Sequence, residues 1–438
     1  MNNVREKVSV FLKKYEMDFS TVDLEKNCEM FMEEMQKGLD SANSSLRMIP
    51  TYISMDKEIP VNEPVIVIDA GGTNFRVCVV HFDEDKNAVI EDFNVYPMPG
   101  TKGELNKDEF FDTMAKYLLP VIDKSRKIGF CFSYPAETLP NKDGRLMNFS
   151  KEVKVRGVEG EMIGENLLKA VGQHGYDNKK SIVLLNDTVA TLLGGKASFP
   201  NRVFDSYIGF ILGTGTNTCY IEKNCNIGKV EELKTSEGSM LINVESGGYK
   251  KVPRGRIDAE FDSGTVNPGE YAFEKAISGA YQGGLVLAVI RKAAEEKLFS
   301  GEFKEKLKEV KILSSKEIDD FLYYPYADNI LAACCAASGN EEDRLVLFNL
   351  VDAIFERAAK FVTFNLAATI LKTGKGTNPC APVCITADGS TFYKSKLFKG
   401  KLEHYVKTYM NETKNIYCEF VKAENGNLIG TAIAALLN

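Results

Sequence analysis

The chain has 438 residues, of which 44% are apolar and 26% charged, and a formal net charge of -7 at pH 7. This length is enough for a large core in two lobes, and the acidic balance without a long basic run argues against nucleic acid or an anionic membrane as the main partner. The ten cysteines include no C-x-x-C pair and there are three histidines, so we expect reduced thiols and no metal site built by the protein alone.

The segment before Pro50 places apolar side chains at helical spacing, and Pro50 interrupts the pattern. This helical segment starts with charged residues and has no apolar stretch of the signal-peptide type. No later apolar run is long enough to cross a bilayer. We therefore expect a cytoplasmic protein without a membrane partner.

From Val65 onward, short apolar strands alternate with helices in the manner of an α/β lobe. The predicted strands cover 65–69, 75–82, 88–96 and 128–132, and the predicted helices cover 107–119 and 161–172. A further strand at 181–185 leads into a helix at 188–196. We expect the chain to cross to a second lobe near residue 184.

The turn between the first two strands, residues 69–76 (Asp-Ala-Gly-Gly-Thr-Asn-Phe-Arg), has a composition suited to phosphate binding. Its two glycines lack a Cβ, so their N–H groups can approach phosphate oxygens and their backbone can adopt positive φ. The Thr, Asn and Arg add donors, and Asp69 is placed to hold a Mg²⁺-bound water. An ordinary glycine turn beside an aspartate accounts for the same residues.

A second hairpin begins near Tyr207 and repeats this pattern, with residues 213–217 (Gly-Thr-Gly-Thr-Asn) between two apolar strands. Two such turns suggest two related α/β lobes that hold a nucleotide between them. Other nucleotide folds fit less well, because the sequence has no G-x-x-x-x-G-K-[ST] motif and Thr218 stands where a dinucleotide motif has its third glycine.

Helical patterns dominate the rest of the chain until an apolar strand at 382–386, which runs into Ala387-Asp388-Gly389-Ser390. The predicted helices cover 270–298, 303–311, 315–322 and 341–373. A final apolar helix covers 427–437.

Asn186 and Asp187 lie where a buried strand ends and a helix begins. This position suits a general base, since a sugar hydroxyl that attacks a γ-phosphate needs its proton accepted. It equally suits the N-cap of the helix, and the local sequence leaves both interpretations open. Other polar side chains fit either a polyol site or ordinary caps and surface positions; they are Ser133, Ser150, Lys151, Glu245 and Glu274.

Taken in order, these motifs resemble those of the hexokinases, which have the sugar kinase/actin/heat-shock ATPase fold, and the resemblance extends from Met48 almost to the C-terminus. The matching blocks are 48–52 (Met-Ile-Pro-Thr-Tyr), 69–76, 132–135 (Phe-Ser-Tyr-Pro), 186–188 (Asn-Asp-Thr), 213–217, 242–245 (Ile-Asn-Val-Glu), 267–269 (Asn-Pro-Gly), 274–279 (Glu-Lys-Ala-Ile-Ser-Gly) and 388–390 (Asp-Gly-Ser). The resemblance implies an α/β, two-lobed actin-like ATPase (ribonuclease H-like) fold with a hinged cleft. The small lobe would comprise 64–183 plus 426–438, and the large lobe 1–63 plus 184–425.

The resemblance also implies an ATP-dependent hexokinase, which transfers the γ-phosphoryl group of Mg-ATP to the 6-hydroxyl of a hexose, with glucose expected, for glycolysis. Asp187 would be the general base and Lys151 a second catalytic residue. The hexose contacts would be Ser133, Ser150, Lys151, Asn186, Asp187, Asn217, Glu245 and Glu274. The nucleotide contacts would be Asp69, Gly71, Gly72, Thr73, Asn74 and Arg76 in a first phosphate loop, Gly213, Thr214 and Gly215 in a second, and Gly389 and Ser390 beside adenosine. Mg²⁺ would arrive with ATP.

Two blocks depart from the family pattern. Ser246 follows Glu245 where members often have Trp, and this chain contains no Trp; residues 150–151 keep only the hydroxyl and the lysine of the usual Trp-Thr-Lys-Gly-Phe. The sugar preference is therefore open, and a kinase of the same fold for a ketohexose or an amino sugar is one alternative. A sugar sensor would not need the base, and an actin-like filament subunit would not need the sugar contacts. Either a monomer or a homodimer is expected.

Overall fold

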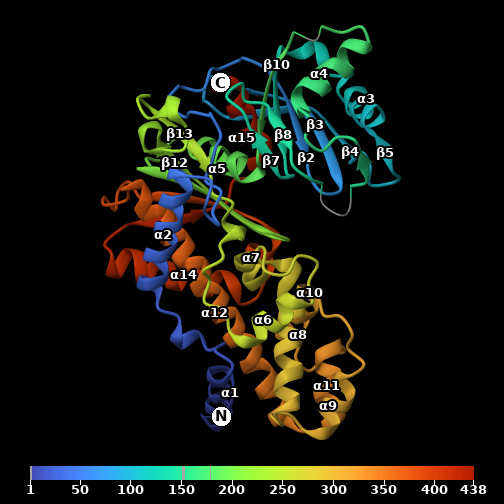
Figure 1. Ribbon diagram of the computed structural model, residues 1–438, viewed down its shortest axis with the longest axis vertical. Helices are drawn as coiled ribbons and strands as arrows, with labels where there is room; N and C mark the ends of the chain where they lie inside the picture. The colour runs from blue at the N-terminus through green and yellow to red at the C-terminus, as the bar shows by residue number, and fades with distance from the viewer. Residues whose placement is uncertain (1, 150–152, 178) are drawn as a thin grey trace.

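The computed structural model describes residues 2–149, 153–177 and 179–438, and its strands form two main β-sheets (Figure 1). A five-stranded sheet lies at one end of the molecule, and a six-stranded sheet lies between it and a large group of helices. This two-lobed α/β arrangement is the one that the sequence predicts.

The five-stranded sheet combines parallel and antiparallel pairs. Its strands, in spatial order, are β10 (Ser181–Leu185), β6 (Lys127–Phe132), β2 (Val65–Ala70), β3 (Asn74–Phe82) and β4 (Ala88–Pro97), and the helices around it are α3 (Lys107–Leu118), α4 (Ile163–Gln173) and α15 (Gly426–Leu437). Alternate side chains of β2 point to opposite faces. Ile66 and Ile68 share an apolar cluster with α3 and α4, whereas Val65 and Val67 share one with α15. β2 is therefore buried along its whole length.

The six-stranded sheet contains the second predicted hairpin. Its strands, in spatial order, are β1 (Ile49–Pro50), β13 (Ser239–Asn243), β12 (Thr216–Lys223), β11 (Ser206–Leu212), β14 (Val383–Asp388) and β15 (Cys418–Val421). β11 pairs antiparallel with β12 and parallel with β14. The turn of the hairpin and the end of β14 consequently lie at the same edge of the sheet.

Helix α5 (Asp187–Ser198) connects the two sheets through its contact with α15. α5 packs against β11 and β14, and α15 packs against β2 and β6. The helices approach closely because glycine removes side chains from the contact: a Cβ at Gly194 would lie 2.4 Å from the carbonyl oxygen of Gly426, and one at Gly430 would lie 1.9 Å from that of Ala190. Side chains at these positions would force the two helices, and with them the two sheets, apart.

The remaining helices surround the six-stranded sheet and extend away from it (Figure 1). They are α1 (Asn2–Lys14), α2 (Leu24–Asp40), α6 (Arg256–Ser263), α7 (Ala272–Ile277), α8 (Gly279–Glu295), α9 (Gly301–Leu307), α10 (Ser315–Tyr323), α11 (Ile330–Ser338), α12 (Glu341–Thr373), α13 (Ser390–Lys394) and α14 (Phe398–Val406). Four short strands lie outside the two main sheets: β5 (Leu105–Asn106), β7 (Ala136–Thr138), β8 (Gly144–Leu146) and β9 (Val155–Arg156). α12, with 33 residues, is buried on most of its surface, so its apolar residues do not follow a one-sided pattern.

The prediction of one continuous helix over 270–298 is wrong. The helix breaks at Ser278, which is extended with φ -83° and ψ 158°. The N–H groups of Gly279 and Ala280 donate to the carbonyls of Gly213 and Thr214, at 2.8 and 3.1 Å. Tertiary hydrogen bonds to the second turn thus replace the helical bonds that the local pattern favours.

The division of the chain at residues 63/64, 183/184 and 425/426 stays a prediction. β10, in the five-stranded sheet, extends to Leu185, and α15 begins at Gly426. Within the described ranges, no helix combines the length and the apolar composition that a membrane span requires.

Candidate functional site

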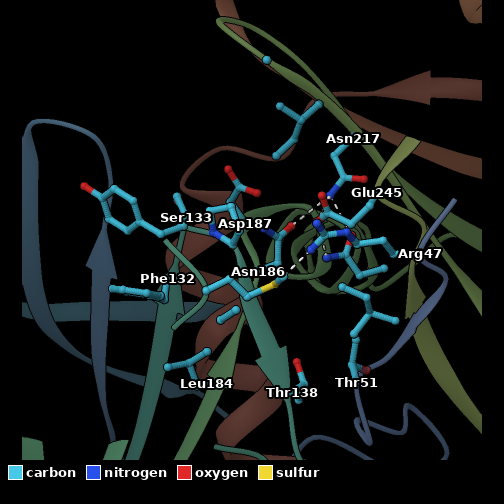
Figure 2. Close-up of a pocket in the computed structure, with 18 of the residues that line it drawn as sticks. Arg47, Thr51, Phe132, Ser133, Thr138, Leu184, Asn186, Asp187, Asn217 and Glu245 are labelled. Carbon is cyan, nitrogen blue, oxygen red and sulfur yellow. Dashed lines mark hydrogen bonds between the residues drawn. The ribbon is translucent and has the colours of Figure 1, made fainter. Parts of the chain in front are cut away.

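A polar cavity of about 240 Å³ lies between the two sheets (Figure 2). Six of the predicted hexose contacts line it: Ser133, Asn186, Asp187, Asn217, Glu245 and Glu274. They come from the ends of β6, β10, β12 and β13 and from the short helix α7, so the fold gathers residues that are far apart in sequence. The other two predicted contacts, Ser150 and Lys151, lie outside the described residues.

Asn186 and Asp187 divide between them the two roles that the local sequence left open. Asn186 is extended, and its Oδ1 accepts the backbone N–H of Thr188 at 2.9 Å, so Asn186 is the N-cap of α5. Asp187 is the first residue of the helix, and its carboxylate faces the cavity (Figure 2). Because Asn186 supplies the helix cap, the Asp187 carboxylate is not needed for it and is available to a ligand in the cavity.

The pKa of Asp187 is raised to about 7, chiefly because the surrounding protein desolvates its carboxylate. Hydrogen bonds from Thr188 oppose this shift, whereas the negative charges of Asp69 and Glu245 add to it. A carboxyl group that titrates near neutral pH is suited to accept and release a proton.

Asn217, Asn243 and Glu245 form a hydrogen-bonded group on the opposite wall. Nδ2 of Asn217 donates to Oδ1 of Asn243 at 2.7 Å, and Nδ2 of Asn243 donates to Oε1 of Glu245 at 2.8 Å. Glu245 has a left-handed backbone, with φ 58° and ψ 47°, an uncommon conformation for a residue with a Cβ. Burial raises the pKa of its carboxyl group, and the Asn243 hydrogen bond and the positive charge of Arg47 oppose that shift.

Glu274 lies on α7, and its Oε2 accepts the backbone N–H of Thr216 at 3.0 Å. Burial raises its pKa to about 6, and that hydrogen bond opposes the shift. The neighbouring Lys275 is buried and donates to the Asp262 carboxylate and to the carbonyl of Asn267. This anchored helix holds Glu274 at the cavity rather than on the surface, where a helical glutamate usually lies.

Several lining residues were not predicted as site residues, among them Arg47, Thr51, Thr138, Met147 and Asn243. Arg47 immediately precedes the 48–52 block, and Asn243 lies inside the 242–245 block. Their proximity to these blocks was the sequence feature that could have identified them as site residues. Their side-chain types alone did not distinguish them from surface residues.

The first glycine turn lies next to a second, more open cavity of about 440 Å³. Asp69 and Arg76 line that cavity together with Asp388 and the start of α15. Arg76 Nη1 donates to Asp69 Oδ2 at 2.6 Å across the β2–β3 pair. Burial raises the pKa of Asp69, and the Arg76 guanidinium opposes that shift.

The residues at the tip of this turn are exposed, although bonds from outside the turn hold its backbone. The Tyr134 hydroxyl donates to the Gly71 carbonyl at 2.9 Å, and the Met98 N–H donates to the Thr73 carbonyl at 3.0 Å. The Gly71 N–H donates to the Asn74 carbonyl at 3.0 Å, and Gly72, Thr73 and Asn74 are exposed. Neither glycine adopts positive φ. The space that these glycines leave beside the backbone, and not a left-handed conformation, is therefore what they offer to a ligand.

The second turn packs directly against the end of β14. A Cβ at Gly213 would lie 3.5 Å from the Cα of Gly389 and 3.7 Å from the backbone nitrogen of Ser390. The Thr391 hydroxyl donates to the Gly213 carbonyl at 2.9 Å. The fold thus brings together the predicted second phosphate loop, including Thr214 and Gly215, and the predicted adenosine-side residues.

No group of three or more His, Cys, Asp or Glu side chains among residues 2–149, 153–177 and 179–438 is arranged to hold a metal ion. A single carboxylate that opens onto a cavity, as Asp69 does, fits the way Mg²⁺ is held when substrate phosphates and water supply its other ligands.

Comparison with known proteins gives matches along the whole chain. Sequence models of the hexokinase family match residues 10–197 and 207–437. Human hexokinase-2 is 30% identical over 451 residues, covering 98% of this chain and 48% of that protein, so the chain spans about half the length of this relative. Hexokinase-1 of Schizosaccharomyces pombe is 27% identical over 427 residues, covering 93% of this chain and 86% of that protein. The solved structure of the Schistosoma mansoni hexokinase, complexed with glucose, superposes with a TM-score of 0.78 at 27% identity and covers 99% of each chain.

Proposed function

Because the chain belongs to the hexokinase family, we propose that it transfers the γ-phosphoryl group of ATP to the 6-hydroxyl of a hexose, giving hexose 6-phosphate and ADP for glycolysis. The single observation that carries this proposal is the Asp187 carboxylate, which faces a polar cavity between two sheets and has a pKa of about 7. Glucose is the proposed hexose, since the similar Schistosoma mansoni enzyme was solved in complex with it.

Asp187 is the proposed general base. Phosphoryl transfer requires mainly that the attacking oxygen be aligned and its proton accepted. The ionised Asp187 carboxylate accepts the proton of the 6-hydroxyl while that oxygen bonds to the γ-phosphorus and the bond from this phosphorus to the departing ADP oxygen breaks. The proton later passes to solvent. A pKa near the working pH keeps both forms of the carboxyl group populated, as this cycle requires.

The two walls of the cavity would share the recognition of the sugar. Glu245 and Glu274 accept hydrogen bonds when ionised, and Asn186 and Asn217 can both donate and accept. Ser133 contributes a hydroxyl from the side of the five-stranded sheet. Ser150 and Lys151, with Lys151 as a second catalytic residue, stay proposals from the family resemblance.

The nucleotide would lie in the open cavity beside the first turn. Asp69, Gly71, Gly72, Thr73, Asn74 and Arg76 would meet its phosphates from one lobe, and Gly213, Thr214, Gly215, Gly389 and Ser390 would meet the phosphates and adenosine from the other. Mg²⁺ bound to ATP neutralises phosphate charge, and Asp69 would hold it through a water. The proximity of Gly213 to Gly389 supports this assignment.

Both lobes must contact the same hexose for the site to be complete. Closure of the cleft around the sugar would therefore exclude water, which otherwise competes as the phosphoryl acceptor. A cytoplasmic location and a monomeric or homodimeric state stay predictions.

The test is the release of ADP and of hexose 6-phosphate with Mg-ATP and glucose, for the wild type, for Asp187→Ala and for Asp187→Asn. Loss of the base should lower kcat by about 10²–10⁴-fold. Circular dichroism should change little, because Asp187 forms no ion pair with another described residue. Calorimetric glucose binding should be retained, because the other lining residues of the cavity remain in place.

Asp85→Asn, in an exposed turn, is the matched control and should leave kcat unchanged. Wild-type turnover in both Asp187 variants would exclude Asp187 as the base. A panel that adds fructose and glucosamine separates the glucose kinase from the alternative acceptors, and glucose binding without any transfer would instead indicate a sensor.

A further inference from the structure

Arg47 lies at the mouth of the polar cavity, just before β1, and its side chain is directed toward Glu245 (Figure 2). Among the described residues that line this cavity, Arg47 is the one with a positively charged side chain. The acidic residues that line it are Asp187, Glu245 and Glu274. Arg47 is also an exposed residue, so a ligand that enters the cavity can reach it.

The guanidinium of Arg47 uses little of its hydrogen-bonding capacity. Its Nη1 donates to the Sδ of Met147 at 2.9 Å, and a thioether is a weak acceptor. Arg47 makes no ion pair with a carboxylate in the described parts of the chain. Most arginines of the chain do, for example Arg76 with Asp69. The remaining N–H donors of Arg47 can therefore bind a ligand without breaking a strong bond.

The Arg47 side chain also links the two walls of the cavity through its contact with Met147. Arg47 belongs to the segment that leads into the six-stranded sheet, and Met147 follows β8 and bonds through its N–H to the Pro135 carbonyl at 2.9 Å. Pro135 follows β6 of the five-stranded sheet. The Arg47–Met147 contact thus joins the two walls between which the hexose would bind.

A hexose needs both hydrogen-bond donors and hydrogen-bond acceptors in its binding site. Each hydroxyl can donate one hydrogen bond and accept others, and ionised carboxylates can only accept. Glu245 and Glu274 therefore satisfy hydroxyl protons but not hydroxyl oxygens. An arginine next to Glu245 supplies donors at the point where acceptors predominate, and hydrogen bonds from a charged donor are stronger than those from a neutral one.

We propose that Arg47 is a hexose-binding residue that contributes to sugar specificity, donating from its guanidinium to a hydroxyl oxygen on the side of the sugar that faces Glu245. The Met147 contact holds the guanidinium in place until the sugar arrives. This inference rests on the proposed function, since it takes a hexose as the ligand of the cavity.

The experiment is calorimetric binding of glucose and of the series of monodeoxyglucoses, without nucleotide, to the wild type, Arg47→Met and Arg47→Lys. The matched control is Arg126→Met, because Arg126 is also exposed and precedes β6 at the end remote from the cavity. Arg47→Met should weaken glucose binding by about tenfold or more, since a hydrogen bond from a charged donor is lost. Arg47→Lys should recover part of the affinity, and the control should bind like the wild type.

The deoxy sugars distinguish contact from an indirect effect. With the one monodeoxyglucose that lacks the hydroxyl bound by Arg47, the wild type and Arg47→Met should bind equally. An equal loss of affinity for every sugar in the series, or no loss for glucose, would overturn the inference while leaving the proposed function intact. A wild type that binds no hexose at all would overturn both.

Discussion

The two glycine turns have nearly the same residues but very different surroundings. In the first, between β2 and β3, residues 72–74 are exposed, and the Gly71 and Thr73 carbonyls accept bonds from the Tyr134 hydroxyl and the Met98 N–H. In the second, between β11 and β12, Gly213 is buried and its carbonyl accepts bonds from both Gly279 and Thr391. Both turns are held by hydrogen bonds from outside, but the first exposes three successive residues to solvent, whereas the second packs Gly213 against Gly389.

The two proposed phosphate loops therefore differ in how closely other segments pack on them. The exposed residues of the first turn leave open space around its N–H and side-chain donors. The second turn is held in place by α8 and by the residues that follow β14. Little ordering entropy is therefore lost when a ligand binds to it, but added side-chain atoms would clash. Substitutions in the two turns should therefore act on different properties.

The largest expected effect is on stability, from Gly389→Ala beside the second turn. Gly389 has φ 112° and ψ 144°, and a Cβ there would lie 2.2 Å from the Leu212 carbonyl oxygen. Strain and steric overlap should together lower the free energy of unfolding by about 3 kcal/mol. Urea denaturation followed by circular dichroism measures this change.

Gly71→Ala in the first turn is the matched comparison. A Cβ at Gly71 would meet only the Asn74 carbonyl oxygen, at 3.7 Å, which is an ordinary contact. The free energy of unfolding should stay within about 0.5 kcal/mol of the wild type. Equal destabilisation by Gly71→Ala and Gly389→Ala would break the distinction between an exposed and a closely packed turn.

A smaller effect is expected from Gly215→Ala, which links the second turn to the sugar site. A Cβ at Gly215 would lie 2.7 Å from Oε2 of Glu274. A flexible side chain can move away, so the protein should fold, but Glu274 would leave its position. The KM for glucose should rise about tenfold, equivalent to about 1.4 kcal/mol, which should exceed any rise in the KM for ATP.

Gly103→Ala serves as the control for Gly215→Ala, because a Cβ at Gly103 would contact nothing within 4 Å. Its KM for glucose should equal that of the wild type. A rise in the KM for ATP alone in Gly215→Ala would contradict the proposed link from Gly215 through Glu274 to the hexose.

The smallest effect expected is the pH dependence of Asp187, which lies between the two turns. The ionised carboxylate is the proposed base, and its pKa is about 7, so kcat/KM should rise with pH and reach half its plateau near pH 7. An acid limb centred near the ordinary value of 3.8 would contradict the desolvated environment.

Stability should show the opposite trend. The folded protein raises the Asp187 pKa from 3.8 to about 7, so it favours the protonated form, and the contribution of Asp187 to stability falls as pH rises through that interval. Asp187→Asn, which stays neutral, should therefore melt a few °C above the wild type at pH 8 and at about the same temperature at pH 4. Identical differences at both pH values would contradict this assignment.

The regular elements of the lobes were predictable because their local patterns agree with their tertiary environment. The strand at 65–69 and the helix at 107–119 appear as β2 and α3 with ends within one residue. The break at Ser278 was not predictable, since the groups that replace its helical bonds belong to residues 213–214. Helix α11 was missed as well, because its alanines and cysteines show no clear one-sided pattern.

The sequence by itself determined which residues have the chemistry of the site: the acids, amides and glycine turns in their family order, and the Asn-Asp pair at a strand end. Only the tertiary structure decided that Asn186 caps α5 while Asp187 faces the cavity. It also decided that Glu245, Glu274 and Arg47 line the same cavity. The physical reason is that side-chain type is a local property, whereas desolvation, charge coupling and hydrogen-bond partners depend on groups that the fold brings from distant parts of the chain.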